Sequence, residues 1–185
     1  GGTDGTYDLA CRWAGPQVTV LEQMPGEGKQ HALHRCLAEA KGTVILLTDA
    51  DCEFSNEAFT SLLEPLAQGK AQVVTGVSEP KIEQRASALV QYQWFGDLFG
   101  AQHMPPLVDG VLGRNCALLR SVLEAVGGFE TPVHTGTDYF LSRRLVRAGY
   151  QIHAVPHSRV ATEYPISPRA YLRMWRRWIK NLLIH

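Results

Sequence analysis

The feature that most constrains the fold is a short apolar run that ends in two carboxylates. Val44–Leu47 is followed by Thr48 and then by Asp49 and Asp51. A continuous apolar run of this length predicts a buried central strand of an α/β sheet, although periodicity alone leaves a helical segment open. Ligands of open α/β sheets bind beyond the carboxyl ends of the strands, and Asp49 and Asp51 would emerge there.

The spacing of these aspartates indicates what they could bind. In extended backbone, residues i and i+2 point to the same side, so both carboxylates can face one point. A hard divalent cation that also bridges phosphate oxygens would relieve their mutual repulsion. The alternative is structural, because Asp51 could cap a helix that runs through residues 56–59.

The length and charge of the chain set broad limits. Its 185 residues suffice for one domain with a sizeable core. The net charge is zero, but residues 143–185 carry nine Lys or Arg and one acidic residue, Glu163. This basic last quarter suggests phosphate or an anionic membrane surface as its neighbour. No stretch approaches the about 18 apolar residues of a membrane span.

Four cysteines show neither C-x-x-C nor a zinc-ligand spacing with the histidines. We therefore expect them to be reduced, buried thiols in a cytosolic compartment.

Strand and helix patterns alternate along the chain. Helices are predicted over 7–13, 29–40, 56–68, 82–99, 121–126 and 137–148, and strands over 17–21, 44–47, 72–77 and 150–155, with a strand-loop-strand over 108–119. This alternation predicts an α/β fold with a largely parallel sheet. Most of the aromatic residues of 82–99 are interpreted as core. Neither a G-x-G-x-x-G turn after a strand nor a P-loop is present.

Three further features accompany the aspartate pair. Lys29 follows a glycine loop at a helix start, where an ammonium and backbone N–H groups can hold phosphate. Asp138 stands at the start of another helix, after a Gly-rich turn. Residues 173–178 interleave arginines with tryptophans, which suit phosphate binding and stacking. Together they provide a metal site, a diphosphate clamp and a separate base, as glycosyl transfer from a nucleotide sugar requires.

The order of these motifs resembles that of family 2 glycosyltransferases, an inverting group with a GT-A fold. Similar segments are 1–6 (the end of D-D-G-S-T-D-G-T), 25–33 (G-K-x-x-A-L), 49–51 (D-x-D), 113–129 (G-x-N-x-x-x-R-x-x-x-x-x-x-G-G-F), 137–139 (the E-D position) and 174–178 (Q/R-x-x-R-W). The resemblance implies a Rossmann-like, mostly parallel sheet flanked by helices. It also implies that the first strand or strands precede residue 1, so residues 1–185 are expected to be a single catalytic domain cut at both ends.

The resemblance also implies roles for individual residues. Asp49 and Asp51 would hold Mg²⁺ or Mn²⁺, and Asp138 would be the general base. Binding of the donor diphosphate would fall to Lys29, Asp49, Asp51, Arg177 and Trp178, and the acceptor side to Gly113, Arg114, Asn115 and Thr137. Thr137 replaces the usual acidic neighbour of the base, and Met174 the usual Gln or Arg.

Structural alternatives remain open for several of these side chains. Asp138 could be only a helix cap, Lys29 a solvated surface charge, and Arg114 a partner of Asp109. The arginines after residue 172 could form no more than the wet face of an amphipathic helix.

The last eighteen residues, 168–185, have the pattern of an interfacial helix. One helical stripe is aromatic and aliphatic, with basic residues around it: Tyr171, Trp175, Trp178 and Leu182. We expect this helix to lie on a membrane and to lead into a membrane segment, with the domain on the cytoplasmic face.

Several partners and functions remain open from the sequence. A UDP-sugar is favoured over a GDP-sugar as donor, and the acceptor could be a lipid or a polysaccharide. The main alternative is a catalytically silent scaffold domain of a membrane synthase. A nucleotidyltransferase would need a phosphate loop that is not visible, and nucleic acid is the least favoured partner.

Overall fold

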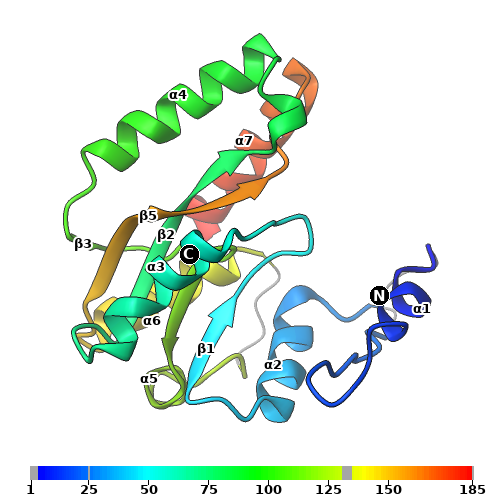
Figure 1. Ribbon diagram of the computed structural model, residues 1–185, viewed down its shortest axis with the longest axis vertical. Helices are drawn as coiled ribbons and strands as arrows, with labels where there is room; N and C mark the ends of the chain where they lie inside the picture. Colours follow the sequence, from blue (N-terminus) through cyan, green and yellow to red (C-terminus); the bar gives the residue numbers. More distant parts are fainter. Residues whose placement is uncertain (1–3, 25, 131–134, 185) are drawn as a thin grey trace.

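A mixed five-stranded sheet forms the centre of the computed structural model, which describes residues 4–24, 26–130 and 135–184 (Figure 1). The elements follow the chain in this order: α1 (Thr6–Cys11), α2 (Lys29–Glu39), β1 (Val44–Leu47), α3 (Asn56–Ala67), β2 (Val73–Pro80), a 3₁₀ turn (Ile82–Gln84), α4 (Ala88–Gln102), β3 (Leu107–Val108), β4 (Cys116–Leu119), α5 (Arg120–Ala125), α6 (Thr137–Arg147), β5 (Ile152–Thr162) and α7 (Pro168–Ile184). The α/β class predicted from the alternating pattern is confirmed.

The prediction of a largely parallel sheet is wrong in detail. The strand order is β1-β4-β2-β5-β3, and among the described strands only β2 and β5 pair in parallel. Cys116, the first residue of β4, pairs with Leu47, the last residue of β1. β3 and β4 are joined by a loop and not by a crossover helix. β4 lies between β1 and β2 and runs antiparallel to both of them.

β1 lies at an edge of the described sheet, not at its centre. Its side chains nevertheless contact both layers of core: Ile45 and Leu47 pack on one cluster, Val44 and Leu46 on the other. A strand with apolar residues on both faces is therefore covered on both faces of the sheet. The same pattern does not show whether the strand has one or two hydrogen-bonded neighbouring strands.

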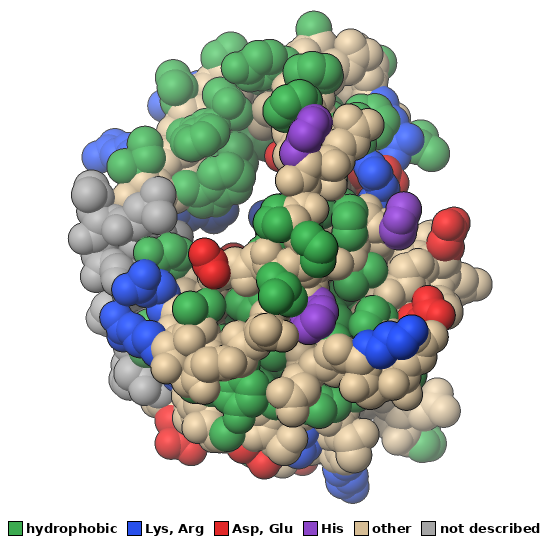
Figure 2. Space-filling view, turned by 90° about the vertical axis from the view of Figure 1, so that its left-hand side faces the viewer, with side chains coloured by type: hydrophobic (Ala, Val, Ile, Leu, Met, Phe, Trp, Pro, Cys, Tyr) green, Lys and Arg blue, Asp and Glu red, His purple; other side chains and the backbone are tan. Residues whose placement is uncertain are grey.

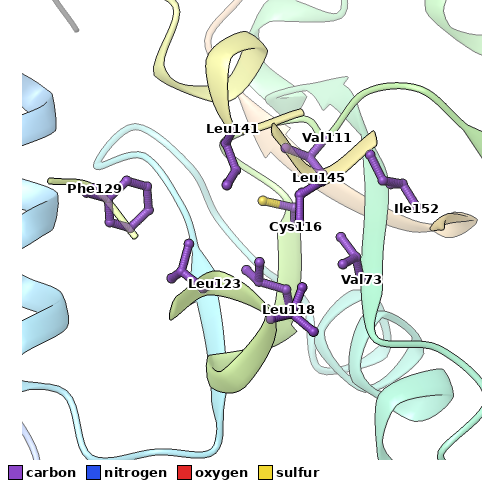
Figure 3. Packing of buried hydrophobic residues seen from close by; sticks show 10 residues of the cluster. Val73, Val111, Cys116, Leu118, Leu123, Phe129, Leu141, Leu145 and Ile152 are labelled. Atoms are coloured by element: carbon purple, nitrogen blue, oxygen red, sulfur yellow. The ribbon is translucent and has the colours of Figure 1, made fainter. Parts of the chain in front are cut away.

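Two apolar clusters cover the two faces of the sheet. Helix α3 packs on one face through Leu62 and Leu66, against Val74 and Ala117. The other face carries the larger cluster, to which α5, α6 and the strands contribute (Figure 3): Val73, Val111, Cys116, Leu118, Val122, Leu123, Phe129, Leu141, Leu145 and Ile152. Leu33 and Leu37 of α2 pack against this cluster. The starts of α2 and α6 are thereby fixed relative to the end of β1.

Two local predictions fail. Residues 17–21 form no strand, and Val18 makes only an isolated bridge with Gly15. The helix predicted over 82–99 is divided into a 3₁₀ turn and α4. Its aromatic residues are not all core, because Tyr92 and Phe95 are each 68% exposed and Phe99 is 55% exposed. Helical periodicity could not show that only one side of α4 lies against the sheet.

Asn115 ties three segments together beneath the loop that leads into β4. Its side chain is fully buried and donates to the carbonyls of Val77 and Ser158, each at 2.9 Å, while its Oδ1 accepts from the Ser158 hydroxyl at 3.2 Å. A Cβ at Gly76 would overlap the same amide. Asn115 therefore sets how closely β2, β5 and this loop approach one another.

Replacing Asn115 with Ala is expected to lower the free energy of unfolding by roughly 2–4 kcal/mol, because two buried carbonyls lose their donor. Urea unfolding followed by circular dichroism measures the loss. Gln68→Ala is the control, since the amide of Gln68 bonds only to exposed Glu64, and its effect should stay within about 0.5 kcal/mol. Equal stability of the two variants would contradict this role of Asn115.

Candidate active site

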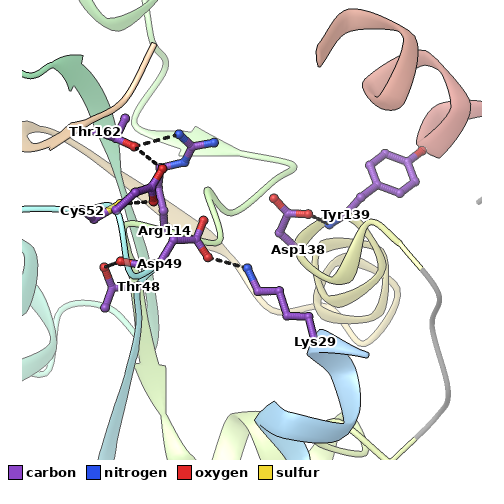
Figure 4. A network of polar contacts seen from close by, with 9 residues as sticks. Lys29, Thr48, Asp49, Cys52, Arg114, Asp138, Tyr139 and Thr162 are labelled. Atoms are coloured by element: carbon purple, nitrogen blue, oxygen red, sulfur yellow. Dashed lines mark hydrogen bonds and ion pairs between the residues drawn. The ribbon is translucent and has the colours of Figure 1, made fainter. Parts of the chain in front are cut away.

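Three segments distant in the sequence meet at the carboxyl end of β1. A small pocket is lined by residues from the start of α2, the end of β1, the loop before β4 and the start of α6: Lys29, Leu33, Leu47, Thr48, Gly113, Thr137, Asp138 and Leu141. Asp49 follows Thr48 and bonds to Lys29 at this place (Figure 4). The structure thus gathers five of the residues that the sequence assigned to the site: Lys29, Asp49, Gly113, Thr137 and Asp138.

Lys29 is paired rather than merely solvated. Its Nζ lies 2.5 Å from Oδ1 of Asp49, although the two residues are twenty apart in the chain. Both side chains are partly open to solvent, so the pair contributes little to stability. Its significance is electrostatic, because it holds an ammonium beside a carboxylate at the first residue of a helix, where N–H groups are free to bind an anion.

Asp51 has different partners. Its Oδ2 accepts from the Thr162 hydroxyl at 3.3 Å and its Oδ1 lies 3.6 Å from the thiol of Cys52. It does not cap the following helix: α3 is capped by Ser55, whose Oγ accepts from the N–H of Ala58 at 3.0 Å. The capping alternative for Asp51 is therefore excluded.

The two carboxylates suit one class of metal. Within residues 4–24, 26–130 and 135–184, no group of three or more His, Cys, Asp or Glu is placed to hold an ion. Zn²⁺ in structural or catalytic sites takes three or four protein ligands. Mg²⁺, by contrast, commonly uses one or two carboxylates together with water and substrate phosphates. The donor set of Asp49 and Asp51 therefore fits a hard cation that binds together with a phosphorylated ligand.

Asp138 lies in the first turn of α6 but is not its cap. Gly136, which has no side chain, holds the N-cap position in left-handed backbone (φ 72°). The Asp138 carboxylate accepts one local bond, from the N–H of Tyr139 at 2.9 Å. Its remaining acceptor capacity faces the pocket shared with Lys29 and Gly113. The position suits a base that receives a proton from a ligand.

Gly113 touches the candidate base directly. A Cβ built on Gly113 would lie 2.8 Å from Cβ of Asp138 and 3.3 Å from its Oδ2. The loop before β4 can approach α6 this closely only because residue 113 has no side chain.

Arg114 and Asn115, predicted on the acceptor side, do not line the pocket that Lys29 and Asp138 share. Arg114 donates to the Thr162 hydroxyl at 3.4 Å, on the Asp51 side of the site, and no ion pair with Asp109 occurs among the described residues. The Asn115 side chain is fully buried, so the prediction that it lines the acceptor side is wrong. G-x-N spacing could not distinguish an amide that packs inward from one that faces a ligand.

Arg177 and Trp178 lie on the exposed face of α7. Among the described residues, no hydrogen bond or ion pair joins them to Lys29, Asp49 or Asp51, and their role as a diphosphate clamp stays a prediction. Aromatic rings meet edge to face along the helix, with the ring centres of Trp175 and Trp178 5.6 Å apart. The side chain of Leu182 and residues 1–3, which belong to the first similar segment, lie outside the described part.

The cysteines differ from one another more than predicted. All four are free, but Cys11 and Cys36 are exposed, Cys52 is partly buried and only Cys116 is buried. Burial raises the pKa of Cys116 to about 12, reinforced by the nearby charge of Asp138. Burial also raises the pKa of Cys52 above its usual value. The thiols of Cys52 and Cys116 are therefore protonated at neutral pH, and the Cys52 thiol can donate a hydrogen bond to the Asp51 carboxylate.

Comparison with known proteins identifies the family. Residues 4–181 match the family model described as "Glycosyltransferase like family 2". This chain belongs to glycosyltransferase family 2. The mixed sheet with flanking helices is the GT-A fold of its structural neighbours.

Two solved glycosyltransferases show the likeness in fold. The mannosyltransferase PcManGT from Pyrobaculum calidifontis, in complex with GDP-Man and Mn²⁺, is 23% identical, with a TM-score of 0.69 over 97% of this chain. Glucosyl-3-phosphoglycerate synthase from Mycobacterium tuberculosis, in complex with Mn²⁺ and UDP-glucose, is 22% identical, with a TM-score of 0.57 over 99% of this chain.

A curated relative has a similar degree of identity. The probable glycosyltransferase YdaM of Bacillus subtilis (strain 168) is 25% identical over 164 residues, which are 84% of this chain. The family 2 chain spans 38% of YdaM, half of PcManGT and 64% of the mycobacterial synthase.

Proposed function

We propose that this family 2 protein transfers a sugar from a nucleoside-diphosphate donor to an acceptor hydroxyl, with inversion and with Mg²⁺ or Mn²⁺ as cofactor. The observation that carries the proposal is the pocket that brings Lys29 and Asp138 together beside Asp49. Two of the similar structures contain Mn²⁺ with a nucleotide sugar, which supports a donor and a metal of this class here.

The chemistry follows from what each side chain can do. Asp138 receives the proton of the acceptor hydroxyl, whose oxygen forms the new bond to the anomeric carbon as the bond to the diphosphate breaks. Attack from the side opposite the leaving group inverts the anomeric configuration. Asp49 and Asp51 would hold the cation, which when bound offsets the charge that develops on the departing diphosphate. Lys29 supplies a further positive charge at the same place.

A UDP-sugar is the favoured donor and a lipid or growing glycan the favoured acceptor. Release of nucleoside diphosphate from UDP- and GDP-sugars, with Mn²⁺ and membrane extract present, tests the proposal on the full-length protein. We expect release from one nucleotide series only. No release from either series would favour the silent scaffold domain.

We further propose that this domain acts at the cytoplasmic face of a membrane, with α7 lying in the interface. Exposed apolar residues occur on α7 (Leu172, Trp175, Trp178 and Ile179) and on α4 (Tyr92, Phe95 and Phe99). Figure 2 shows hydrophobic side chains gathered over the upper part of one face. Basic residues flank the aromatic ones on α7: Arg169, Arg173, Arg176, Arg177 and Lys180. No helix in the described part of the chain is both long and apolar enough to span a bilayer.

Replacing Trp175 with Ser is expected to weaken binding to vesicles that contain anionic lipid by about tenfold, the value of one large apolar side chain leaving the interface. Co-sedimentation with such vesicles measures the change. Trp13→Ser is the matched control, since Trp13 is 77% exposed but lies beyond the end of α1. Equal weakening by both substitutions would contradict an interfacial role of α7.

A further inference from the structure

We propose that Thr162 is a positioning residue, whose hydroxyl fixes the Asp51 carboxylate in the orientation that binds the cation, with Arg114 holding the hydroxyl from behind. The inference rests on the proposed function, because it concerns the same metal site. It adds a residue that lies 111 positions from Asp51 in the chain.

The chemistry of the three groups sets the direction of both hydrogen bonds. Arg114 can only donate, so the bond of 3.4 Å from its Nη1 uses a lone pair of the Thr162 hydroxyl. The hydroxyl proton is then available for Oδ2 of Asp51, at 3.3 Å. Thr162 is fully buried at the end of β5, between Arg114 and Asp51 (Figure 4).

The backbone holds Thr162 at a fixed distance from the aspartates. Glu53 and Ala161 exchange two backbone hydrogen bonds of 2.8 and 3.1 Å, which join the segment after Asp51 to the end of β5. The carbonyl of Thr162 also accepts from the N–H of Lys81 at 3.2 Å. The hydroxyl therefore approaches Asp51 from a rigid strand end and not from a mobile loop.

Thr162 also separates a positive charge from the metal site. Among the described residues Arg114 forms no ion pair with Asp51, because the hydroxyl stands between them. Arg114 can thus polarise the hydroxyl without neutralising the carboxylate. Removing a hydrogen-bond partner of a metal-binding side chain typically lowers metal affinity 10–100-fold.

The test compares two substitutions of Thr162 in the full-length protein. Thr162→Val keeps the shape but removes the hydroxyl, and Thr162→Ser keeps the hydroxyl. Mn²⁺ affinity in the presence of nucleoside diphosphate is measured from the signal of free Mn²⁺ in electron paramagnetic resonance. We expect Thr162→Val to bind Mn²⁺ 10–100-fold more weakly and Thr162→Ser to stay within about threefold of the wild type.

Ser158→Ala is the matched control, because it removes another fully buried hydroxyl from β5 that bonds to Ala58 and Asn115 rather than to Asp51. It should lower stability and leave Mn²⁺ affinity unchanged. If Thr162→Val does not fold, Arg114→Met replaces it: loss of the donor frees the hydroxyl to rotate, and Mn²⁺ affinity should fall severalfold.

The outcomes separate this inference from the proposed function. Unchanged Mn²⁺ affinity in Thr162→Val, or in Arg114→Met where that variant is used, with affinity lost in Asp51→Ala, overturns the role of Thr162 and leaves the metal site standing. A wild-type protein that does not bind Mn²⁺ with either UDP or GDP refutes both.

Discussion

Replacing Asp138 with Asn is expected to lower kcat by about 10²–10⁴, the usual contribution of a general base. The amide keeps the size of the carboxylate but cannot take the acceptor proton. Among the described residues, the hydrogen bond from the N–H of Tyr139 is the only one that ends on this side chain, so the fold should be retained. The Asp138→Asn protein should bind the nucleoside diphosphate as the wild type does, because Asp49, Asp51 and Lys29 are unchanged.

Steady-state rates and nucleotide affinity are to be measured on the same preparation. Glu57→Gln is the matched control, since Glu57 is an exposed acidic residue in the first turn of α3, as Asp138 is in the first turn of α6. It tests whether loss of any acidic residue at a helix start slows the enzyme. A kcat of Asp138→Asn within threefold of the wild type would rule out this base.

Replacing Gly113 with Ala is expected to reduce kcat by about 10²-fold although no ionisable group is replaced. The new Cβ would lie 2.8 Å from Cβ of Asp138, so the base or the loop must shift. A displacement of about 1 Å is enough for such a loss when reacting groups must be aligned. Gly113 is not in left-handed backbone, so strain in the main chain does not confuse the result.

Gly110→Ala in the same loop is the matched control, because it adds the same methyl group to the loop without a close contact to Asp138. A Cβ there would meet only Oγ of Ser142, at an ordinary 3.8 Å. Its kcat should match that of the wild type, and both variants should retain nucleotide affinity. Equal rates for Gly113→Ala and the wild type would show that Asp138 tolerates displacement and is not the base.

The elements with strong local signals were predicted well from the sequence. Gly-rich turns and helix starts located α2 and α6, and the apolar run located β1. The direction of β4 and the edge position of β1 depend on which strands form hydrogen bonds across the sheet. One-dimensional periodicity carries no such information. The exposure of Phe95 and Tyr92 escaped prediction for the same reason, since an all-round apolar helix does not reveal which side is covered.

The residues of the candidate site were likewise predicted only in part from the sequence. Lys29 and Asp138 each follow a Gly-rich turn and Asp49 follows the apolar run of β1, and the structure brings the three together. Thr162 could not be found, because its link to Asp51 spans 111 residues and no motif surrounds it. Asn115 was assigned to the acceptor side from its motif, whereas its amide serves the packing of β2 and β5. A motif gives the residue type at a position but not the direction of its side chain.

Calorimetric titration of UDP and GDP into the full-length protein tests the metal-dependent donor site most directly. Each nucleotide is titrated with Mn²⁺ and with EDTA, into the wild type and into Asp51→Ala, with Asp138→Asn as the folded control. We expect one nucleotide to bind only when Mn²⁺ is present, and this binding to be lost in Asp51→Ala but kept in Asp138→Asn. Two results would contradict a nucleotide-sugar transferase that uses these aspartates. One is a folded wild-type protein that binds neither nucleotide. The other is a nucleotide affinity that stays the same when EDTA replaces Mn²⁺ and when Asp51 is replaced with Ala.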